Sequence, residues 1–160
     1  MHKHLRTTLL SALALATLAA ASSIALAQQA PKPENLIKWR QSAYQVVAWN
    51  SGRIKAAVDG NYNKDEVLKA ANAIAAVANS GLGALFAPGT ETGKGWRETT
   101  VKPALFTDGK RVGELAGAFS QEANELVKVA NTGDQAALKE QFGKLTKTCK
   151  ACHDDYRNTN

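Results

Sequence analysis

The feature that most constrains the fold of this chain is an apolar stripe with helical spacing, which occurs four times. Apolar residues that recur every three, four or seven positions lie on one face of an α-helix, and that face must be buried against a partner. The stripes run through residues 36–58, 67–78, 112–130 and 138–156. No segment alternates apolar and polar residues over a useful length, so the sequence predicts an all-α fold.

The connections predict how the helices are arranged. Gly60-Asn61 ends the first stripe, and Asn131-Thr132-Gly133 ends the third. Asn63, with Glu66 three positions on, forms a capping-box variant before the second stripe. By contrast, residues 81–109 form a long connection that holds six glycines and two prolines. Short, long and short connections are typical of an antiparallel four-helix bundle.

The first 27 residues have the pattern of a secretory signal peptide. A short basic stretch ends at Arg6, residues 7–31 carry no charge, and Ala25-Leu26-Ala27 matches a small-x-small cleavage motif. We expect cleavage between Ala27 and Gln28, which leaves residues 28–160 as one periplasmic domain. The alternative is an uncleaved membrane anchor, because the uncharged stretch is long enough to span a bilayer.

Removal of this segment changes the charge and the set of possible metal ligands. Lys3 and Arg6 leave and no acidic residue does, so the net charge falls from +6 to +4. A mildly basic chain with no run of more than two Lys or Arg does not indicate nucleic-acid binding. After cleavage we expect no membrane segment. The other two histidines and the one methionine leave with the segment, so His153 becomes the only histidine.

Cys149-Lys150-Ala151-Cys152-His153 is the most specific motif in the chain. Cys-x-x-Cys-His is the attachment signature of c-type haem, in which two thiols bond to the vinyl groups and the imidazole binds the iron. At about 100° per residue, the three side chains lie within about a 100° arc of one helix. The motif predicts one covalent haem c, with Cys149 and Cys152 as thioether residues and His153 as iron ligand.

Other interpretations of the motif fit less well. A thioredoxin-type site needs a βαβ setting at a helix start, and a zinc site needs carboxylates to complete two Cys and one His. A disulfide between Cys149 and Cys152 would strain a helix. The interpretation of His153 as an ordinary core histidine is weakened together with these alternatives.

The face of the iron opposite His153 has no obvious ligand. Low-spin electron carriers use Met or a second His there, and the processed chain has neither. We therefore expect a five-coordinate, high-spin iron with an open, apolar face. Such an iron binds small gases if a pocket admits them.

These features resemble the cytochrome c′ family, whose haem lies near the C-terminus of a four-helix bundle. Residues 39–44 (Trp-Arg-Gln-Ser-Ala-Tyr) resemble its first-helix Arg-Gln stretch. Residues 86–90 (Phe-Ala-Pro-Gly-Thr) resemble its Phe-Gly-Pro-Gly-Thr loop, with Ala in place of the first Gly. Residues 149–157 resemble its Cys-x-x-Cys-His-x-x-Tyr-Arg ending. The three segments span essentially the whole processed chain in the expected order.

The resemblance implies roles around the haem for five residues and one segment. They are Arg40 and Gln41 by the propionates, Tyr44 over the open iron face, Phe86 in the pocket wall, Arg157 on the proximal side, and residues 99–103 along the haem edge. Taken alone, Arg40 could be a solvated helix residue, Tyr44 ordinary core packing, and Arg157 a complement to the helix dipole.

A possible dimer face lies on the first helix. Trp39, Val46 and Trp49 fall off its main stripe, and an exposed apolar strip often marks an interface. Family members form dimers through their first helices, so the resemblance implies a homodimer with this strip as its face.

The open iron and the resemblance together predict a periplasmic haem protein that binds NO and CO, for NO carriage or protection. The alternative is a periplasmic electron-transfer cytochrome, whose redox partner the sequence does not identify. A strong sixth ligand would favour that alternative. An enzyme is not expected, because peroxide cleavage usually needs a distal acid–base pair and the only histidine is used by the iron.

Overall fold

Residues 30–158 are described by the structure, a computed structural model, and the predicted signal peptide lies outside them. Within residues 30–158 four α-helices form: α2 (Pro33–Asp59), α3 (Lys64–Ala78), α4 (Gly109–Thr132) and α5 (Gln135–Tyr156). Two short 3-10 helices, η1 (Leu82–Leu85) and η2 (Pro103–Phe106), lie in the long connection. In this part of the chain β-structure is limited to two isolated bridges, so the all-α prediction is confirmed.

Local sequence explains where the helices begin and end. Asn63 Oδ1 accepts a hydrogen bond from the backbone N–H of Glu66, which confirms the predicted cap of α3. Asp108 and Asp134 cap α4 and α5 in the same way. Gly133 ends α4 with a φ of 83°, a left-handed conformation that glycine adopts without steric cost.

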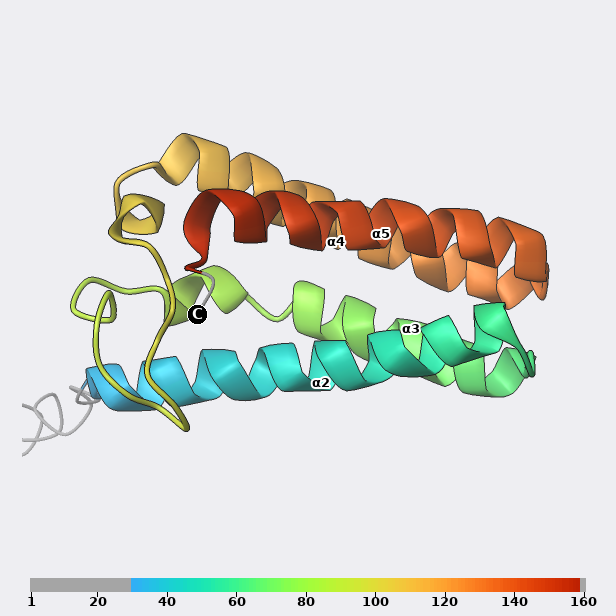
Figure 1. The fold of residues 1–160 in the computed structure, drawn as a ribbon, viewed down its shortest axis with the longest axis horizontal. Helices are drawn as coiled ribbons and strands as arrows, with labels where there is room; N and C mark the ends of the chain where they lie inside the picture. The colour runs from blue at the N-terminus through green and yellow to red at the C-terminus, as the bar shows by residue number, and fades with distance from the viewer. Residues whose placement is uncertain (1–29, 159–160) are drawn as a thin grey trace, which may run out of the picture. The chain divides into compact units, whose positions relative to one another are not determined.

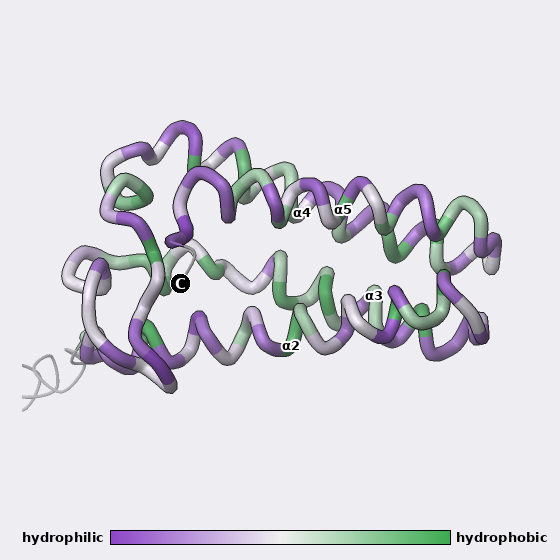
Figure 2. The backbone as a smooth tube through the Cα atoms, viewed as in Figure 1, coloured by the Kyte–Doolittle hydropathy of each residue, from purple (hydrophilic) through white to green (hydrophobic). Residues whose placement is uncertain are grey.

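The helices run antiparallel to their neighbours in the chain (Figure 1). Closely packed pairs are α2 with α3, α3 with α4, and α4 with α5, whereas α2 and α5 make far fewer contacts. Hydrophobic and hydrophilic residues alternate along each helix, as expected for helices with one buried face (Figure 2). The bundle is therefore tightly packed on three sides and loosely packed between α2 and α5.

Large aliphatic side chains from all four helices form the core. Burial of each contributes about 1.5–3 kcal/mol. The largest of these that are fully buried are Ile37, Ile54, Val67, Ile74, Leu126, Leu138 and Leu145. In α4, Leu115 is buried and Ala116 is exposed, so the predicted stripe is wrong at Ala116, whereas Val112 and Phe119 are half-buried as predicted.

None of the helices in residues 30–158 combines the length and apolar character needed to cross a membrane.

Candidate haem-binding site

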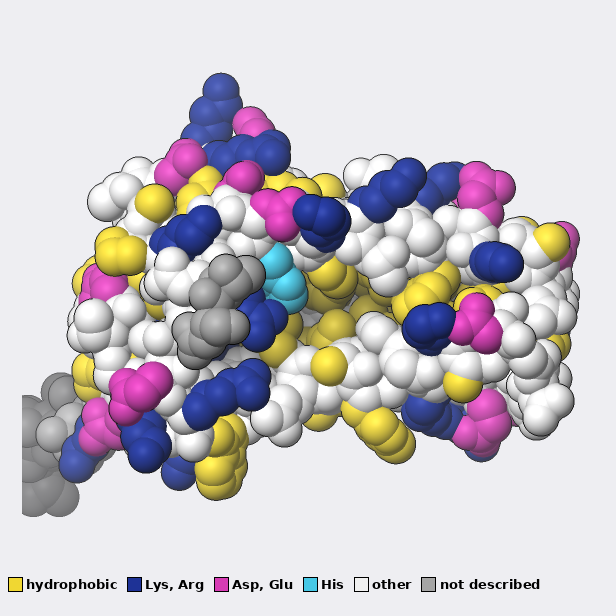
Figure 3. All heavy atoms as spheres, viewed as in Figure 1, with side chains coloured by type: hydrophobic (Ala, Val, Ile, Leu, Met, Phe, Trp, Pro, Cys, Tyr) yellow, Lys and Arg dark blue, Asp and Glu magenta, His cyan; other side chains and the backbone are white. Residues whose placement is uncertain are grey.

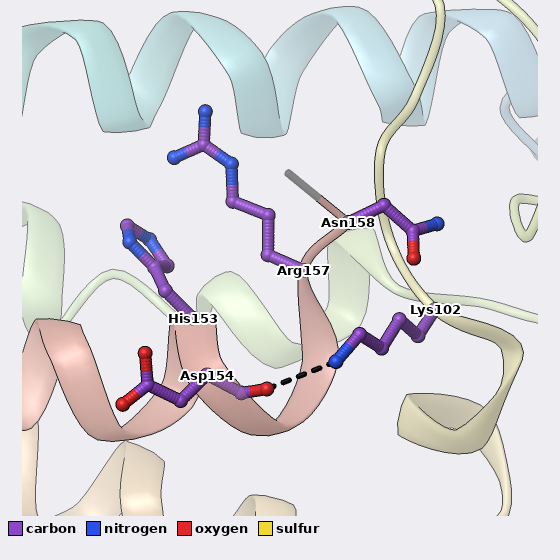
Figure 4. A pocket seen from close by; sticks show the side chains of 5 residues that line it. All are labelled: Lys102, His153, Asp154, Arg157 and Asn158. Carbon is purple, nitrogen blue, oxygen red and sulfur yellow. Dashed lines mark hydrogen bonds between the residues drawn. The ribbon is translucent and has the colours of Figure 1, made fainter. Parts of the chain in front are cut away.

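The Cys-x-x-Cys-His motif lies in the last two turns of α5, on the side that faces α2. Cys149 and Cys152 are half-buried free thiols. His153 and Arg157 project toward α2 (Figure 4). The only histidine among the described residues, cyan in Figure 3, stands at the rim of a hollow with apolar side chains on its floor. The motif thus opens onto the loosely packed side of the bundle.

Burial sets the protonation of the motif. It raises the pKa of both thiols, and Asp155 adds to the rise at Cys152. A disulfide-exchange cysteine needs the opposite, a lowered pKa. Burial, followed by the charge of Arg157, lowers the pKa of His153, which favours the neutral imidazole that binds metals.

The alternatives to haem find little support in residues 30–158. No three His, Cys, Asp or Glu side chains there are grouped so that they could hold a zinc ion. The motif lies at the end of a helix in an all-α unit, without the βαβ setting of thioredoxin-type sites.

Tyr44 lies on α2, the helix toward which His153 projects (Figure 4). It shares a face of α2 with the buried residues Ile37, Arg40 and Val47, yet 41% of it is exposed. Desolvation raises the pKa of Tyr44 to about 12, and Cys152 and Cys149 add to the rise. The electrostatic effect of both thiols on the phenol links Tyr44 on α2 with the motif on α5.

Arg40 is a buried cation that ties the long connection to α2. Only 4% of it is exposed. Its Nη1 donates to Leu85 O (3.2 Å) and Thr90 Oγ1 (2.8 Å), and its Nη2 donates to Thr90 O (2.7 Å) and Thr99 Oγ1 (2.8 Å). Its Cζ lies 4.8 Å from the ring centre of Phe86. Phe86 in turn packs edge-on against Tyr44, with 6.5 Å between ring centres.

The environment of Arg40 suits an anionic group. All four of its acceptors are uncharged, and within the described residues it has no salt-bridge partner. Burial lowers the pKa of Arg40, and Tyr44 followed by Glu91 offsets this only in part. Its Nε–H, the fifth donor of the guanidinium, makes no hydrogen bond there. A buried guanidinium without a counter-ion, on the helix toward which His153 projects (Figure 4), fits haem c, which carries two propionates.

Gln41 holds the tip of the long connection. Its Oε1 accepts from the N–H of Trp96 (2.8 Å), and its Nε2 donates to Arg97 O (2.9 Å). Sequence reasoning missed this contact because the partners are 55 and 56 residues away. The propionate role of Gln41 stays a prediction.

Residues 99–103 join the connection to the end of α5. Lys102 N donates to Tyr156 O, and Asn158 N donates to Thr100 O, each at 2.8 Å. Lys102 Nζ also donates to Asp154 O (2.9 Å), beside His153 (Figure 4). The segment therefore passes the end of α5 that carries the motif, and its place along the haem edge stays a prediction.

Several contacts of the site were not found from sequence. Thr90 and Thr99 hold Arg40, and the Tyr156 hydroxyl donates to Asp108 Oδ2 (2.6 Å). Thr90 belongs to the 86–90 motif and could have been singled out there. Thr99 begins the 99–103 segment, but neither it nor Asp108 carries a local pattern that would reveal its partner.

Comparisons with known proteins agree with this geometry. A family model described as Cytochrome C′ matches residues 35–157. The cytochrome c′ of Rhodocyclus tenuis is 70% identical over 127 residues, which cover 79% of this chain and 96% of that protein.

Two similar solved structures bear on ligands and assembly. One is a cytochrome c′ described as having an unusual ligand-controlled dimer dissociation. It is 46% identical, has a TM-score of 0.78, and the match covers 81% of this chain and 98% of that one. The other is a ferrous variant of cytochrome c prime from Alcaligenes xylosoxidans with bound NO. It is 29% identical with a TM-score of 0.72, and the match covers 81% and 98%.

Proposed function

Because this chain belongs to the cytochrome c′ family, whose members carry covalently attached haem c, we propose that it is a periplasmic protein that binds NO and CO and serves in NO carriage or protection. The observation that carries the proposal is the set of ligands the chain offers. His153 is the only histidine in residues 28–160, and methionine is absent from them. When bound, haem c would supply an iron that can take up a gas, because Met and a second His, the usual ligands opposite the first histidine, are missing from these residues.

The residues that would hold the haem come from two helices. Cys149 and Cys152 would form the thioethers, and His153 would bind the iron. Arg40 would pair with a propionate through its remaining donor. Arg157, whose charge already acts on His153, would lie on the proximal side.

Tyr44, backed by Phe86, would wall the open side. With a pKa of about 12, Tyr44 keeps its proton at neutral pH and can donate a hydrogen bond, but it is not a base. This protonation state suits a gas-binding pocket better than peroxide cleavage, which usually needs a distal base. The NO-bound relative supports NO as one ligand.

The absorption spectrum of the reduced, haem-loaded protein before and after CO addition tests the proposal. We expect a broad, high-spin ferrous spectrum that converts when CO is added. A sharp, low-spin spectrum that CO leaves unchanged would reveal a sixth ligand and make electron transfer the leading function.

Export to the periplasm has a separate test. Mass spectrometry of the protein from the periplasmic fraction should give a chain that begins at Gln28 and carries one haem. A full-length chain in the membrane fraction would instead support the uncleaved anchor.

A homodimer through α2 is the proposed assembly. Trp39, Val46 and Trp49 are 47%, 42% and 66% exposed on α2. The dimer described for the 46% identical structure supports this assembly. Sedimentation velocity should detect a dimer, and a monomer at high concentration would argue against it.

A further inference from the structure

A tight turn formed by residues 93–99 packs on the outside of α2. Thr99 N donates to Gly93 O (2.9 Å) and Gly95 N donates to Arg97 O (3.1 Å). The backbones of Lys94 and Glu98 pair in an isolated antiparallel β-bridge. Because these contacts close the turn on itself, it acts as a compact unit that presents Trp96 at its tip.

The turn touches the backbone of α2 directly. A Cβ on Gly95 would lie 2.7 Å from both Gln41 Oε1 and Lys38 N, so a larger residue would force the turn away from the helix. Gln41 binds the backbone of the turn at two points, since its Oε1 accepts from the N–H of Trp96 and its Nε2 donates to Arg97 O. The turn is thus held by main-chain contacts that leave the Trp96 side chain facing outward.

Trp96 is exposed and yet held in place. It is 62% exposed, but its Nε1 donates to Ser42 Oγ (2.8 Å). Lys38 Nζ lies 4.4 Å from the ring centre. An ordered, exposed tryptophan loses little conformational freedom when a partner covers it, which favours binding.

The position of Ser42 joins Trp96 to the exposed strip of α2. Ser42 is one helical turn from Trp39 and Val46, and two turns from Trp49, so the four residues share one face. Trp49 is itself held, because Arg53 Cζ lies 5.0 Å from its ring centre. All three tryptophans of the chain therefore gather on one exposed surface, and tryptophan is the residue type most enriched in interface hot spots.

We propose that the 93–99 turn and the exposed face of α2 form one self-association surface, in which Trp96 is an anchor and Gln41 a positioning residue. The inference rests on the proposed homodimer and adds a part of the interface from outside the first helix. The occupant is a second copy of this chain, since a similar structure is described as a dimer and a two-fold axis can place one such face against itself.

The test is the dimer dissociation constant of the haem-loaded protein, measured by sedimentation equilibrium. Trp96→Ala should raise the dimer dissociation constant by at least about tenfold. Hot-spot tryptophans contribute strongly to binding, and in a two-fold dimer the substitution removes the side chain from both copies. Ser42→Ala removes only the acceptor of the Trp96 indole N–H and should raise the dissociation constant by a smaller factor. Gln121→Ala, on an exposed position of α4, is the matched control and should leave it unchanged.

Circular dichroism and the CO spectrum of each variant should match the wild type, because Trp96 and Ser42 lie outside the pocket. If Trp49→Ala weakens the dimer while Trp96→Ala and Ser42→Ala do not, the turn is not part of the interface, although the α2 dimer stands. A wild-type protein that stays monomeric at high concentration would overturn both the inference and the dimer.

Discussion

Arg40 is a single residue on which both the long connection and the pocket depend. It is buried, donates four hydrogen bonds to residues 45 to 59 positions away, and stacks on Phe86. A buried cation is costly unless its donors are satisfied. Arg40 therefore contributes to stability only while the connection stays in place.

Replacing Arg40 by Met should lower the free energy of unfolding of the haem-loaded protein by about 2–4 kcal/mol, because buried acceptors lose their donor. Urea unfolding measures this change. The control is Arg97→Met at an exposed position, where a change within about 0.5 kcal/mol is expected. Equal effects of the two substitutions would show that Arg40 does not anchor the connection.

Tyr44 is the side chain expected to limit gas entry. Tyr44→Ala removes a ring that packs against Phe86 and should speed CO binding about tenfold, which corresponds to about 1.4 kcal/mol of barrier. Stopped-flow mixing of the reduced protein with CO measures the rate. Tyr44→Phe keeps the ring and should bind CO at close to the wild-type rate. An unchanged rate in the Ala variant would rule out a gating role.

At the scale of elements, α5 carries the haem motif and depends on a cap at its other end. Asp134 Oδ1 accepts from the backbone N–H groups of Ala136 (2.9 Å) and Ala137 (3.0 Å). These N–H groups lie in the first turn and have no backbone acceptor within the helix, so the Asp134 side chain supplies the acceptor.

Asp134→Ala should lower the free energy of unfolding by about 1 kcal/mol, the usual effect of losing an N-cap. Asp134→Asn retains an acceptor and should cost much less. Thermal unfolding followed by circular dichroism distinguishes the two variants. If both are destabilised alike, the charge of Asp134 matters and its capping oxygen does not.

At the scale of the whole molecule, the side between α2 and α5 is the most loosely packed part of the bundle. These helices make few contacts with each other, and the long connection bridges them by binding Arg40 at one end and Tyr156 and Asn158 at the other. The hollow on this side has apolar side chains on its floor (Figure 3), which suits an apolar group such as a haem.

A Cys149→Ala, Cys152→Ala double variant, which cannot attach haem covalently, should unfold at least about 10 °C below the haem-loaded protein. The reason is that apolar side chains along the hollow stay hydrated. Calorimetry of the two proteins measures the difference, and each single variant, with one thioether left, should fall between them. Equal midpoints would mean that the bundle needs no group in the hollow.

What the sequence by itself determined was the helical class, the helix boundaries and the haem motif. Helical periodicity and caps such as Asn63 act over three or four residues, and Cys149, Cys152 and His153 act within one turn, so their meaning is local. The tertiary structure alone decided what Arg40 and Gln41 hold and where Trp96 lies. Those contacts join residues about 45 to 59 positions apart, and their geometry exists only once the connection has packed against α2 and α5.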